Sequence, residues 1–252
     1  MTQMINDSFY RSALASKISY IKHCNNPNNL KRLQHLQGAN VCNIIDKTNT
    51  GAHMYVYDCG TDAHMIAFRG TVSLKHMMRY CDTSMTTFSI RNKKIKVHSH
   101  ILQLFQSLEN DLSNIICESL ELQKNKTITF CGHSAGGSIA QFAAAYYGDI
   151  TNNNIKINCH TLGSPKVGDT EFINWYNENV TGESIQVVHQ NDWVKMLPFD
   201  NRYTSHKDLI ILNSGGHWTN PMLTHDIDTY INTVNNMLHM TKSPVHTSSD
   251  LS

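Results

Sequence analysis

One stretch of the sequence decides the fold: Thr127-Ile-Thr-Phe-Cys-Gly-His-Ser-Ala-Gly-Gly-Ser-Ile-Ala-Gln-Phe-Ala-Ala-Ala-Tyr-Tyr147. Its first four residues are β-branched or aromatic and predict a buried strand. Its Ala-rich second half has a high helix propensity. Between the two stands Gly132-His-Ser-Ala-Gly136, a G-x-S-x-G motif. A strand followed by this motif and then by a helix predicts a nucleophile elbow.

The elbow explains the residue types in the motif. The turn must be sharp enough to lift the hydroxyl of Ser134 above the sheet, so neighbouring backbones come close and Gly132 and Gly136 fit where larger side chains clash. Ser134 also stands at a helix N-terminus, where N–H groups and the helix dipole favour a developing negative charge. The motif alone is compatible with a plain strand-to-helix turn. The flanking strand and helix favour a catalytic Ser134.

Length and composition limit the class of protein. The chain has 252 residues, which fits one large domain. We expect that domain to span residues 1–240, followed by a polar, disordered tail over 241–252. A net charge of +1 argues against a nucleic-acid partner. No run of about 18 apolar residues predicts a membrane-spanning helix.

The N-terminus and the cysteines suggest a compartment. Residues 1–7 lack a basic region followed by an apolar core, so no secretory signal is visible. The seven cysteines form no C-x-x-C pair, and their odd number argues against a full disulfide framework. We therefore expect reduced thiols and a cytoplasmic location, with an export route that leaves no visible signal as the alternative.

Strands and helices alternate through the middle of the chain, which indicates an α/β fold with a largely parallel central sheet. The first two strands, separated by a short turn, read as an antiparallel pair at the sheet edge. The predicted strands are 54–57, 64–68, 127–130, 155–162, 184–189 and 208–212, and the predicted helices are 2–23, 98–122, 135–147, 171–180 and 223–240.

A short helix is also expected within residues 72–82. Leu74, Met77 and Met78 share one of its faces. That face is either ordinary core packing or the apolar underside of a mobile lid.

A serine hydroxyl needs a base, and the base needs a group that orients it. In hydrolases with this elbow the acid and then the histidine follow the serine along the chain. Asp192 directly follows the strand 184–189 and is the best-placed acid; Asp169, in a Gly-rich loop, is the second choice. His225, at the start of the final helix, is the best-placed base, and His217 is the runner-up.

The oxyanion of the tetrahedral intermediate needs two hydrogen-bond donors. The backbone N–H of Ala135, directly after the nucleophile, is one. Thr71 is the other, because Gly70 allows a tight turn and Thr71 offers both an N–H and a hydroxyl. Arg69 is interpreted as holding this loop through an ion pair, with anion binding as the alternative.

Six short blocks, in this order and spacing, resemble the class 3 lipases, the family of fungal triacylglycerol lipases and related esterases. The resemblance runs from about residue 50 to residue 235. The blocks are Phe68-Arg-Gly-Thr71, Val97-His98, Gly132-His-Ser-Ala-Gly-Gly137, Leu162-Gly-Ser-Pro-Lys-Val-Gly-Asp169, Asp192-Trp-Val-Lys-Met-Leu-Pro198 and His225.

The resemblance implies an α/β-hydrolase fold, a triad of Ser134, Asp192 and His225, and an oxyanion hole formed by Thr71 and Ala135. It also implies that the segment after Thr71 is an amphipathic lid that binds substrate. His98 matches a family position near the site. No cofactor and no metal is implied, and the partner is a lipid ester at a lipid–water interface.

Two departures from the family pattern concern substrate binding. Ala135 stands where the family usually has Leu, which widens the apolar side of the elbow. The lid region reads Lys75-His-Met-Met78 where the family commonly has Trp. Methionines still provide an adaptable apolar face.

The predicted function is a serine ester hydrolase, a lipase that cleaves acyl esters of glycerolipids through an acyl-enzyme. Alternatives are a phospholipase A1 or short-chain carboxylesterase of the same fold, and a lipid-binding hydrolase fold without turnover. A metal enzyme built on His98-Ser-His100 is a further alternative, but no H-E-x-x-H motif or carboxylate partner accompanies that pair.

Overall fold

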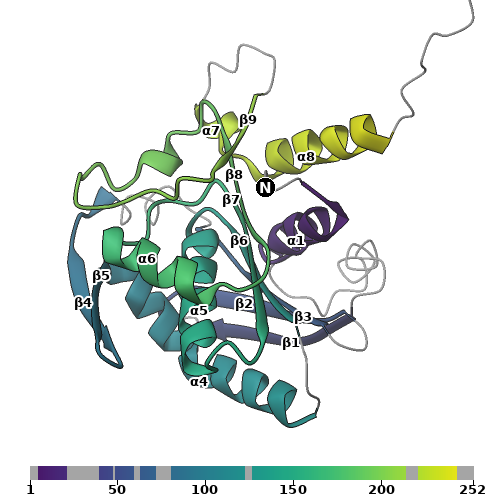
Figure 1. Cartoon of the computed structure of the whole chain (residues 1–252). Coiled ribbons are helices and arrows are strands. Elements are labelled where there is room, and N and C mark those ends of the chain that lie inside the picture. The colour runs from purple at the N-terminus through teal and green to yellow at the C-terminus, as the bar shows by residue number, and fades with distance from the viewer. Residues whose placement is uncertain are drawn as a thin grey trace, which may run out of the picture.

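The computed structural model describes residues 5–21, 40–47, 49–59, 63–71, 81–122, 127–213 and 221–242. Within these residues a seven-stranded sheet has the order β1-β2-β3-β6-β7-β8-β9 (Figure 1). The first three strands are antiparallel, and every pair from β3 to β9 is parallel. The strands are β1 (Asn40–Lys47), β2 (Ala52–Asp58), β3 (Ala63–Phe68), β6 (Thr127–His133), β7 (Lys156–Leu162), β8 (Ser184–His189) and β9 (Ile210–Leu212).

Helices cover both faces of the sheet (Figure 1). The helices α4 (Ser99–Leu122), α5 (Ala135–Ile150) and α6 (Thr170–Asn179) lie on one face. The helices α1 (Asp7–Ile18) and α8 (Ile227–Lys242) lie on the other. This three-layer arrangement buries both faces of a parallel sheet. The predicted α/β fold with a mostly parallel sheet is confirmed.

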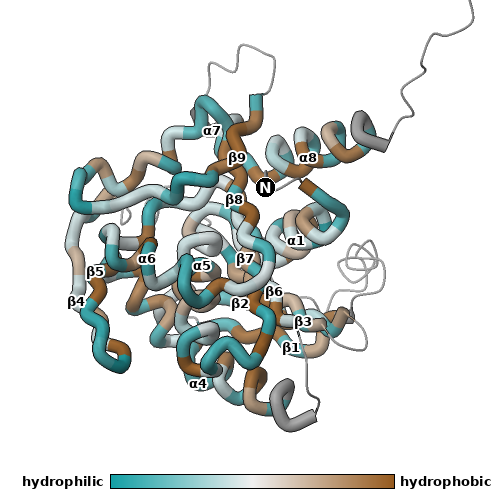
Figure 2. Tube along the Cα trace, viewed as in Figure 1, coloured by the Kyte–Doolittle hydropathy of each residue, from teal (hydrophilic) through white to brown (hydrophobic). Residues whose placement is uncertain are grey.

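The larger core lies between the sheet and helices α4 to α6. Phe105 and Phe142 meet there with their ring centroids 4.7 Å apart, and Trp175 lies against Phe142. The alanines at 143–145 are fully buried, which brings α5 close to the strands. Figure 2 shows brown, hydrophobic residues along the strands and teal, hydrophilic residues on the outer turns of the helices. The Ala-rich sequence thus positions the elbow helix directly on the sheet.

The edge of the sheet differs from the prediction. The strands 54–57 and 64–68 do pair antiparallel, but β1 lies outside them and forms the edge. The strand β1 lacks an alternating apolar pattern, and Ile44 is 39% exposed. Its position is set by backbone pairing with β2, which a side-chain pattern does not reveal.

A hairpin of β4 (Met85–Ile90) and β5 (Lys93–His98) was not predicted. It forms a separate two-stranded sheet and contacts α4 and α6. The alternation was visible in β5, where Ile95 and Val97 are buried and the lysines are exposed.

The predicted final helix, 223–240, is two helices. A short α7 (Pro221–Thr224) ends directly before His225, and α8 begins at Ile227 and continues to Lys242. Asp226 accepts a hydrogen bond from the backbone N–H of Asp228 at 2.9 Å, which caps the start of α8. His225 therefore lies in the break between the two helices.

Several predictions fall on segments outside the described residues. The lid residues Leu74, Met77 and Met78 are among them, as is the runner-up base His217. So are residues 243–252 of the predicted tail, so the division into one domain and a tail stays a prediction. Among the described parts of the chain, no helix is long and apolar enough to cross a bilayer.

Candidate active site

The strand β6 ends in the elbow, and Ser134 takes the strained backbone of its turn. Its φ is 56° and its ψ is −131°, a region that non-glycine residues rarely adopt. A hydrogen bond from the Ser134 N–H to the carbonyl of Leu162, 2.9 Å long, holds this turn against β7. The two flanking glycines are required by close approach: a Cβ on Gly136 would lie 2.2 Å from the carbonyl oxygen of Phe68, and one on Gly132 would lie 2.3 Å from Gly136.

Ser134, His225 and Asp192 are joined by hydrogen bonds. The distance between Ser134 Oγ and His225 Nε2 is 2.8 Å, and that between His225 Nδ1 and Asp192 Oδ2 is also 2.8 Å. All three residues are less than 8% exposed. Because Asp192 is the acceptor, the Nδ1 of a neutral His225 carries the proton and its Nε2 is free to accept the proton of Ser134. The structure brings together the three residues that the sequence selected.

The carboxylate of Asp192 is fixed by two more donors. Its Oδ1 accepts from the backbone N–H of Val194 at 2.9 Å, and its Oδ2 accepts from the hydroxyl of Tyr230 at 2.6 Å. The Tyr230 oxygen itself accepts from the N–H of His189. Charge-assisted hydrogen bonds of this kind hold a buried carboxylate in one orientation. Sequence reasoning missed Tyr230, because nothing in the pattern of α8 marks it as different from a core aromatic residue.

His133, the motif residue before the nucleophile, contacts the backbone of His225 and holds it in place. Burial, together with the neighbouring His225, holds the pKa of His133 well below its usual value, so the ring is neutral. Its Nε2 lies 2.8 Å from the backbone oxygen of His225, which can only accept, so Nε2 carries the proton. Its Nδ1 then accepts from the hydroxyl of Tyr20, also at 2.8 Å. These two hydrogen bonds connect the interruption between α7 and α8, where His225 lies, to the elbow and to the segment after α1.

The predicted oxyanion donors lie beside the elbow. Ala135 is the first residue of α5, where backbone N–H groups are not used within the helix. Thr71 follows β3, whose Phe68 lies opposite Gly132 in the sheet register. The loop from Phe68 to Thr71 packs closely against the elbow, since a Cβ on Gly70 would lie 2.5 Å from the carbonyl oxygen of His133. Both donors therefore lie on the same rim of the sheet as Ser134.

Two other predicted roles have different outcomes. Asp169, the second-choice acid, caps α6: its Oδ1 accepts from the N–H of Phe172 at 3.0 Å. Arg69 is buried, and its Nη2 donates to the carbonyl of Gly51. Within the described residues no carboxylate pairs with Arg69, so the ion pair stays a prediction and the observed contact is this backbone carbonyl.

The alternative metal pair does not form the geometry it needs. His98 ends β5, and α4 begins at Ser99, so the chain is helical where two imidazoles on one side require it to be extended. The Nδ1 of His98 instead accepts from the backbone N–H of His100 at 3.2 Å. Among the described residues, no group of three or more His, Cys, Asp or Glu is arranged to hold a metal ion.

Three buried or half-buried histidines predict that acid destabilises the fold. Burial lowers the pKa of His98 and of His206 to about 4 and that of His133 well below its usual value. Between pH 6.5 and 4 these rings stay neutral in the folded chain but are protonated in the unfolded chain, which binds more protons. The contribution of these neutral rings to the free energy of unfolding is therefore present above pH 6.5. It is lost as the pH falls below 6.5, by up to about 1.4 kcal/mol per pH unit for each ring.

Urea unfolding at pH 7.5 and at pH 5.5 measures this effect. We expect the free energy of unfolding to fall by several kcal/mol over that interval, and His206→Gln to reduce the dependence by about one proton. An unfolding free energy that does not change between these two pH values would contradict the assignment of neutral rings in the folded chain.

The sheet order and the position of a serine at the end of β6 define the class of protein as an α/β hydrolase. Residues 65–202, more than half of the chain, match the model of the family "Lipase (class 3)", and the chain belongs to this family.

Two curated relatives are each 26% identical to the chain. One is a secreted mono- and diacylglycerol lipase 1 of Fusarium solani, aligned over 63% of this chain and 47% of the relative. The other is a lipase of Rhizopus niveus, aligned over 53% of this chain and 34% of the relative. The chain thus covers about half or less of the length of these relatives.

Solved structures show the same fold at low identity. The Yarrowia lipolytica LIP2 lipase superposes with a TM-score of 0.66 at 19% identity, covering 81% of this chain and 78% of that one. A mutant form of MDLA from Penicillium cyclopium superposes with a TM-score of 0.67, also at 19% identity, covering 87% of this chain and 84% of that one.

The expected cytoplasmic location is wrong in the light of these relatives, since one of them is named as a secreted lipase. The expectation rested partly on unpaired cysteines. The described cysteines are indeed free, at positions 42, 59, 81, 117, 131 and 159. Free thiols do not decide the compartment, because a core of this size is stable without disulfides.

Proposed function

We propose that this protein is a serine ester hydrolase, a lipase that cleaves acyl esters of glycerolipids. One observation carries the proposal: the unbroken chain of hydrogen bonds from Ser134 through His225 to Asp192 at the end of the elbow strand. The family to which the chain belongs and the named activities of its relatives support the same class of reaction.

In the proposed mechanism, Ser134 Oγ attacks the ester carbonyl while His225 Nε2 takes its proton. The N–H of Ala135 and the N–H or hydroxyl of Thr71 bind the oxygen that becomes negative. His225 then gives the proton to the departing alcohol, which leaves an acyl group on Ser134. A water molecule, deprotonated by the same imidazole, releases the fatty acid and restores the serine.

Asp192 acts on the base His225 and stays ionised throughout the reaction. Its Oδ2 keeps the proton of His225 on Nδ1 and stabilises the imidazolium that forms when Nε2 is protonated. The hydroxyl of Tyr230 and the N–H of Val194 keep that carboxylate in place, so His225 does not have to reorient during the reaction.

For the substrate we propose a lipid ester presented at a lipid–water interface. We also propose that residues 1–240 act as one catalytic domain. The described elements from α1 to α8 enclose the sheet that carries Ser134, Asp192 and His225, which supports this division.

The test is a series of p-nitrophenyl and glycerol esters of increasing acyl length, each assayed below and above its solubility limit. A lipase is expected to turn over the long-chain esters faster once they form an interface. Turnover restricted to short, dissolved esters identifies a carboxylesterase, and turnover of diacylphospholipids with release of the sn-1 acid identifies a phospholipase A1. Complete failure to hydrolyse any ester would overturn the proposal in favour of a lipid-binding fold without turnover.

A further inference from the structure

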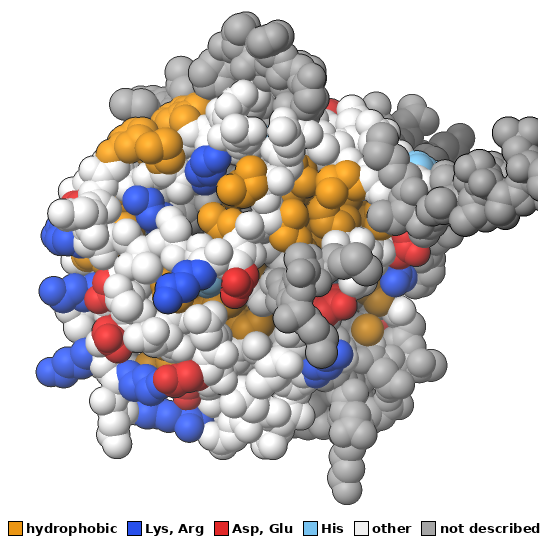
Figure 3. Space-filling view, turned by 45° about the horizontal axis from the view of Figure 1, so that its top comes forward, with side chains coloured by type: hydrophobic (Ala, Val, Ile, Leu, Met, Phe, Trp, Pro, Cys, Tyr) orange, Lys and Arg blue, Asp and Glu red, His pale blue; other side chains and the backbone are white. Residues whose placement is uncertain are grey.

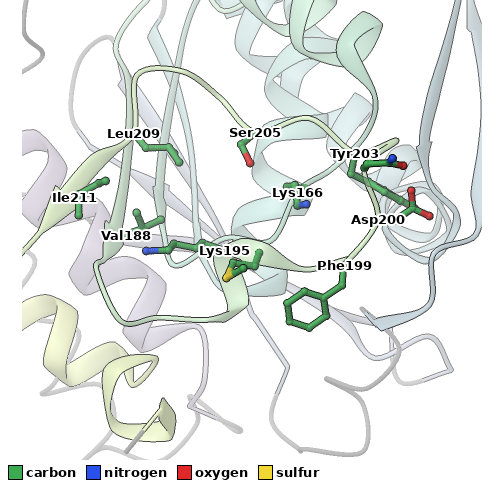
Figure 4. A pocket seen from close by; sticks show the side chains of 11 residues that line it. Lys166, Val188, Lys195, Phe199, Asp200, Tyr203, Ser205, Leu209 and Ile211 are labelled. Carbon is green, nitrogen blue, oxygen red and sulfur yellow. The ribbon is translucent and has the colours of Figure 1, made fainter. Parts of the chain in front are cut away.

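An open hollow of about 530 Å³ is lined by residues of β8 and β9 and by the loop that follows the triad acid. It is lined by Val188 of β8, Ile211 of β9, Lys166 and residues of the segment from Lys195 to Ser205. That segment begins three residues after Asp192, so the hollow and the candidate active site share one stretch of chain. Figure 4 shows the labelled side chains around the opening, among them Lys166, Lys195, Phe199 and Ile211.

The rim of the hollow is apolar and exposed. Met196 is 52% exposed, Phe199 is 62% exposed and Ile211 is 60% exposed. These three are nearly half of the seven large hydrophobic residues that are exposed in the described part of the chain. Leu223 does not line the hollow, but it lies two residues before His225 in the sequence and is 47% exposed. Such a concentration beside the triad marks a surface that contacts something apolar.

The centre of the hollow is positively charged. Lys166 is half-buried, and its ammonium has no hydrogen-bond or ion-pair partner among the described residues. Asp200, an acidic side chain that also lines the hollow, is already bound by the guanidinium of Arg202, with Nε and Nη2 both donating. Burial lowers the pKa of Lys166, and the nearby carboxylate of Asp200 partly offsets this effect.

Lys195 adds a second cation that the fold holds in place. Its Nζ donates to the backbone carbonyls of His189 and Gln190 at the end of β8. The hollow therefore carries two lysines against one carboxylate, and that carboxylate is already hydrogen-bonded to Arg202. On the face that Figure 3 shows, Lys and Arg side chains stand beside gathered hydrophobic ones.

We propose that this hollow and its rim dock the enzyme onto an anionic lipid surface, with Lys166 contacting the negative head groups and Phe199 and Met196 entering the apolar layer below them. This inference rests on the proposed function, because the docked surface would present the ester to Ser134. The opening favours a surface over a small ligand: a small ligand is mostly enclosed by its pocket, whereas the apolar side chains here project outward.

A second copy of the chain is the competing occupant. An interface between two copies brings Lys166 of both near each other or needs an unpaired carboxylate opposite it. Asp200 does not supply that carboxylate, since Arg202 occupies both of its oxygens. An anionic lipid surface satisfies the ammonium and the apolar rim together.

Vesicle flotation tests the proposal with the Ser134→Ala chain, so that hydrolysis does not change the vesicles. Vesicles of phosphatidylcholine alone are compared with vesicles of equal parts phosphatidylcholine and phosphatidylglycerol. Lys166→Gln is expected to weaken binding to the anionic vesicles about fivefold, which corresponds to the roughly 1 kcal/mol carried by one lysine near such a surface. Its binding to neutral vesicles should not change, and added salt should remove the difference.

Two matched controls separate the hollow from the rest of the surface. Lys94→Gln removes the same charge from an exposed position on the β4–β5 hairpin and should change binding by less than about twofold. Phe199→Ser should weaken binding to both kinds of vesicle, whereas Ile150→Ser, at an exposed position that ends α5, should not.

Equal effects of Lys166→Gln and Lys94→Gln, or no effect of either, would overturn the proposal. So would sedimentation of the chain as a dimer that Phe199→Ser converts to a monomer without any vesicle binding. Turnover of a dissolved short-chain ester by chains that keep Ser134 distinguishes the two inferences: Lys166→Gln should leave it unchanged. If the unmodified chain hydrolyses no ester but still binds anionic vesicles through Lys166, the proposed function fails and the docking surface stands.

Discussion

Ser134→Ala is expected to lower kcat for a p-nitrophenyl ester by about a millionfold, by analogy with the loss of the serine in a protease triad. The substitution removes the only atom that lies within hydrogen-bonding distance of His225 Nε2 among the described residues. Little stability should be lost, because the net contribution of one hydrogen bond is only about 1 kcal/mol.

The measurement pairs initial rates with thermal unfolding of the same preparations. A melting temperature within a few degrees of the unmodified chain shows that the variant is folded. Retained turnover in a folded Ser134→Ala variant would refute the role assigned to this serine.

Asp192→Asn is expected to lower kcat by about 10⁴, as the equivalent change does in the protease triad. The N–H of Val194 binds Oδ1, so the new amide nitrogen would take the place of Oδ2 and face the ring of His225. An N–H in that position forces Nδ1 to accept, which puts the proton on Nε2. The imidazole is then unable to take the proton of Ser134.

Asp169→Asn is the matched control. Asp169 caps α6, and Asn caps helices about as well as Asp does, so both activity and stability should be retained. Rates of the two variants on one dissolved ester decide the matter. A large loss of activity in Asp169→Asn, with normal turnover in Asp192→Asn, would show that Asp169 and not Asp192 is the triad acid.

The sequence predicted the elbow, the parallel strands and the three residues of the candidate triad because each leaves a local signal. Gly132 and Gly136 report a close approach of backbones, and strand 184–189 places Asp192 at the edge where parallel strands end. The chain order of serine, acid and histidine then restricts the choice of His225 to the region after that strand.

The support around the triad could not be predicted, because it depends on contacts between distant segments. Tyr20 and His133 are 113 residues apart, and Tyr230 and Asp192 are 38 apart. Their hydrogen bonds arise only once α1 and α8 pack on the same face of the sheet. The strand β1 was missed for a related reason: its place comes from backbone pairing, which leaves no apolar pattern.

The break between α7 and α8 was also hidden. Residues 223–240 have one continuous helical pattern, and the structure interrupts it at His225. The interruption frees the backbone oxygen of His225 to accept from His133 and lets its ring point at Ser134. The tertiary contacts of His225 thus override the helical pattern at the position where the candidate site needs a histidine in a defined orientation.

A covalent probe tests directly whether Ser134 is a nucleophile. A p-nitrophenyl phosphonate ester reacts with an activated serine: the new bond joins Oγ to phosphorus, and p-nitrophenolate leaves. Mass mapping after digestion should place one adduct on the peptide that contains Ser134, and Asp192→Asn should slow its formation. The chain supplies an internal comparison, because Ser12 lies 2.8 Å from His160 Nδ1 but is fully buried. An adduct on Ser12, or none on Ser134, would contradict the account.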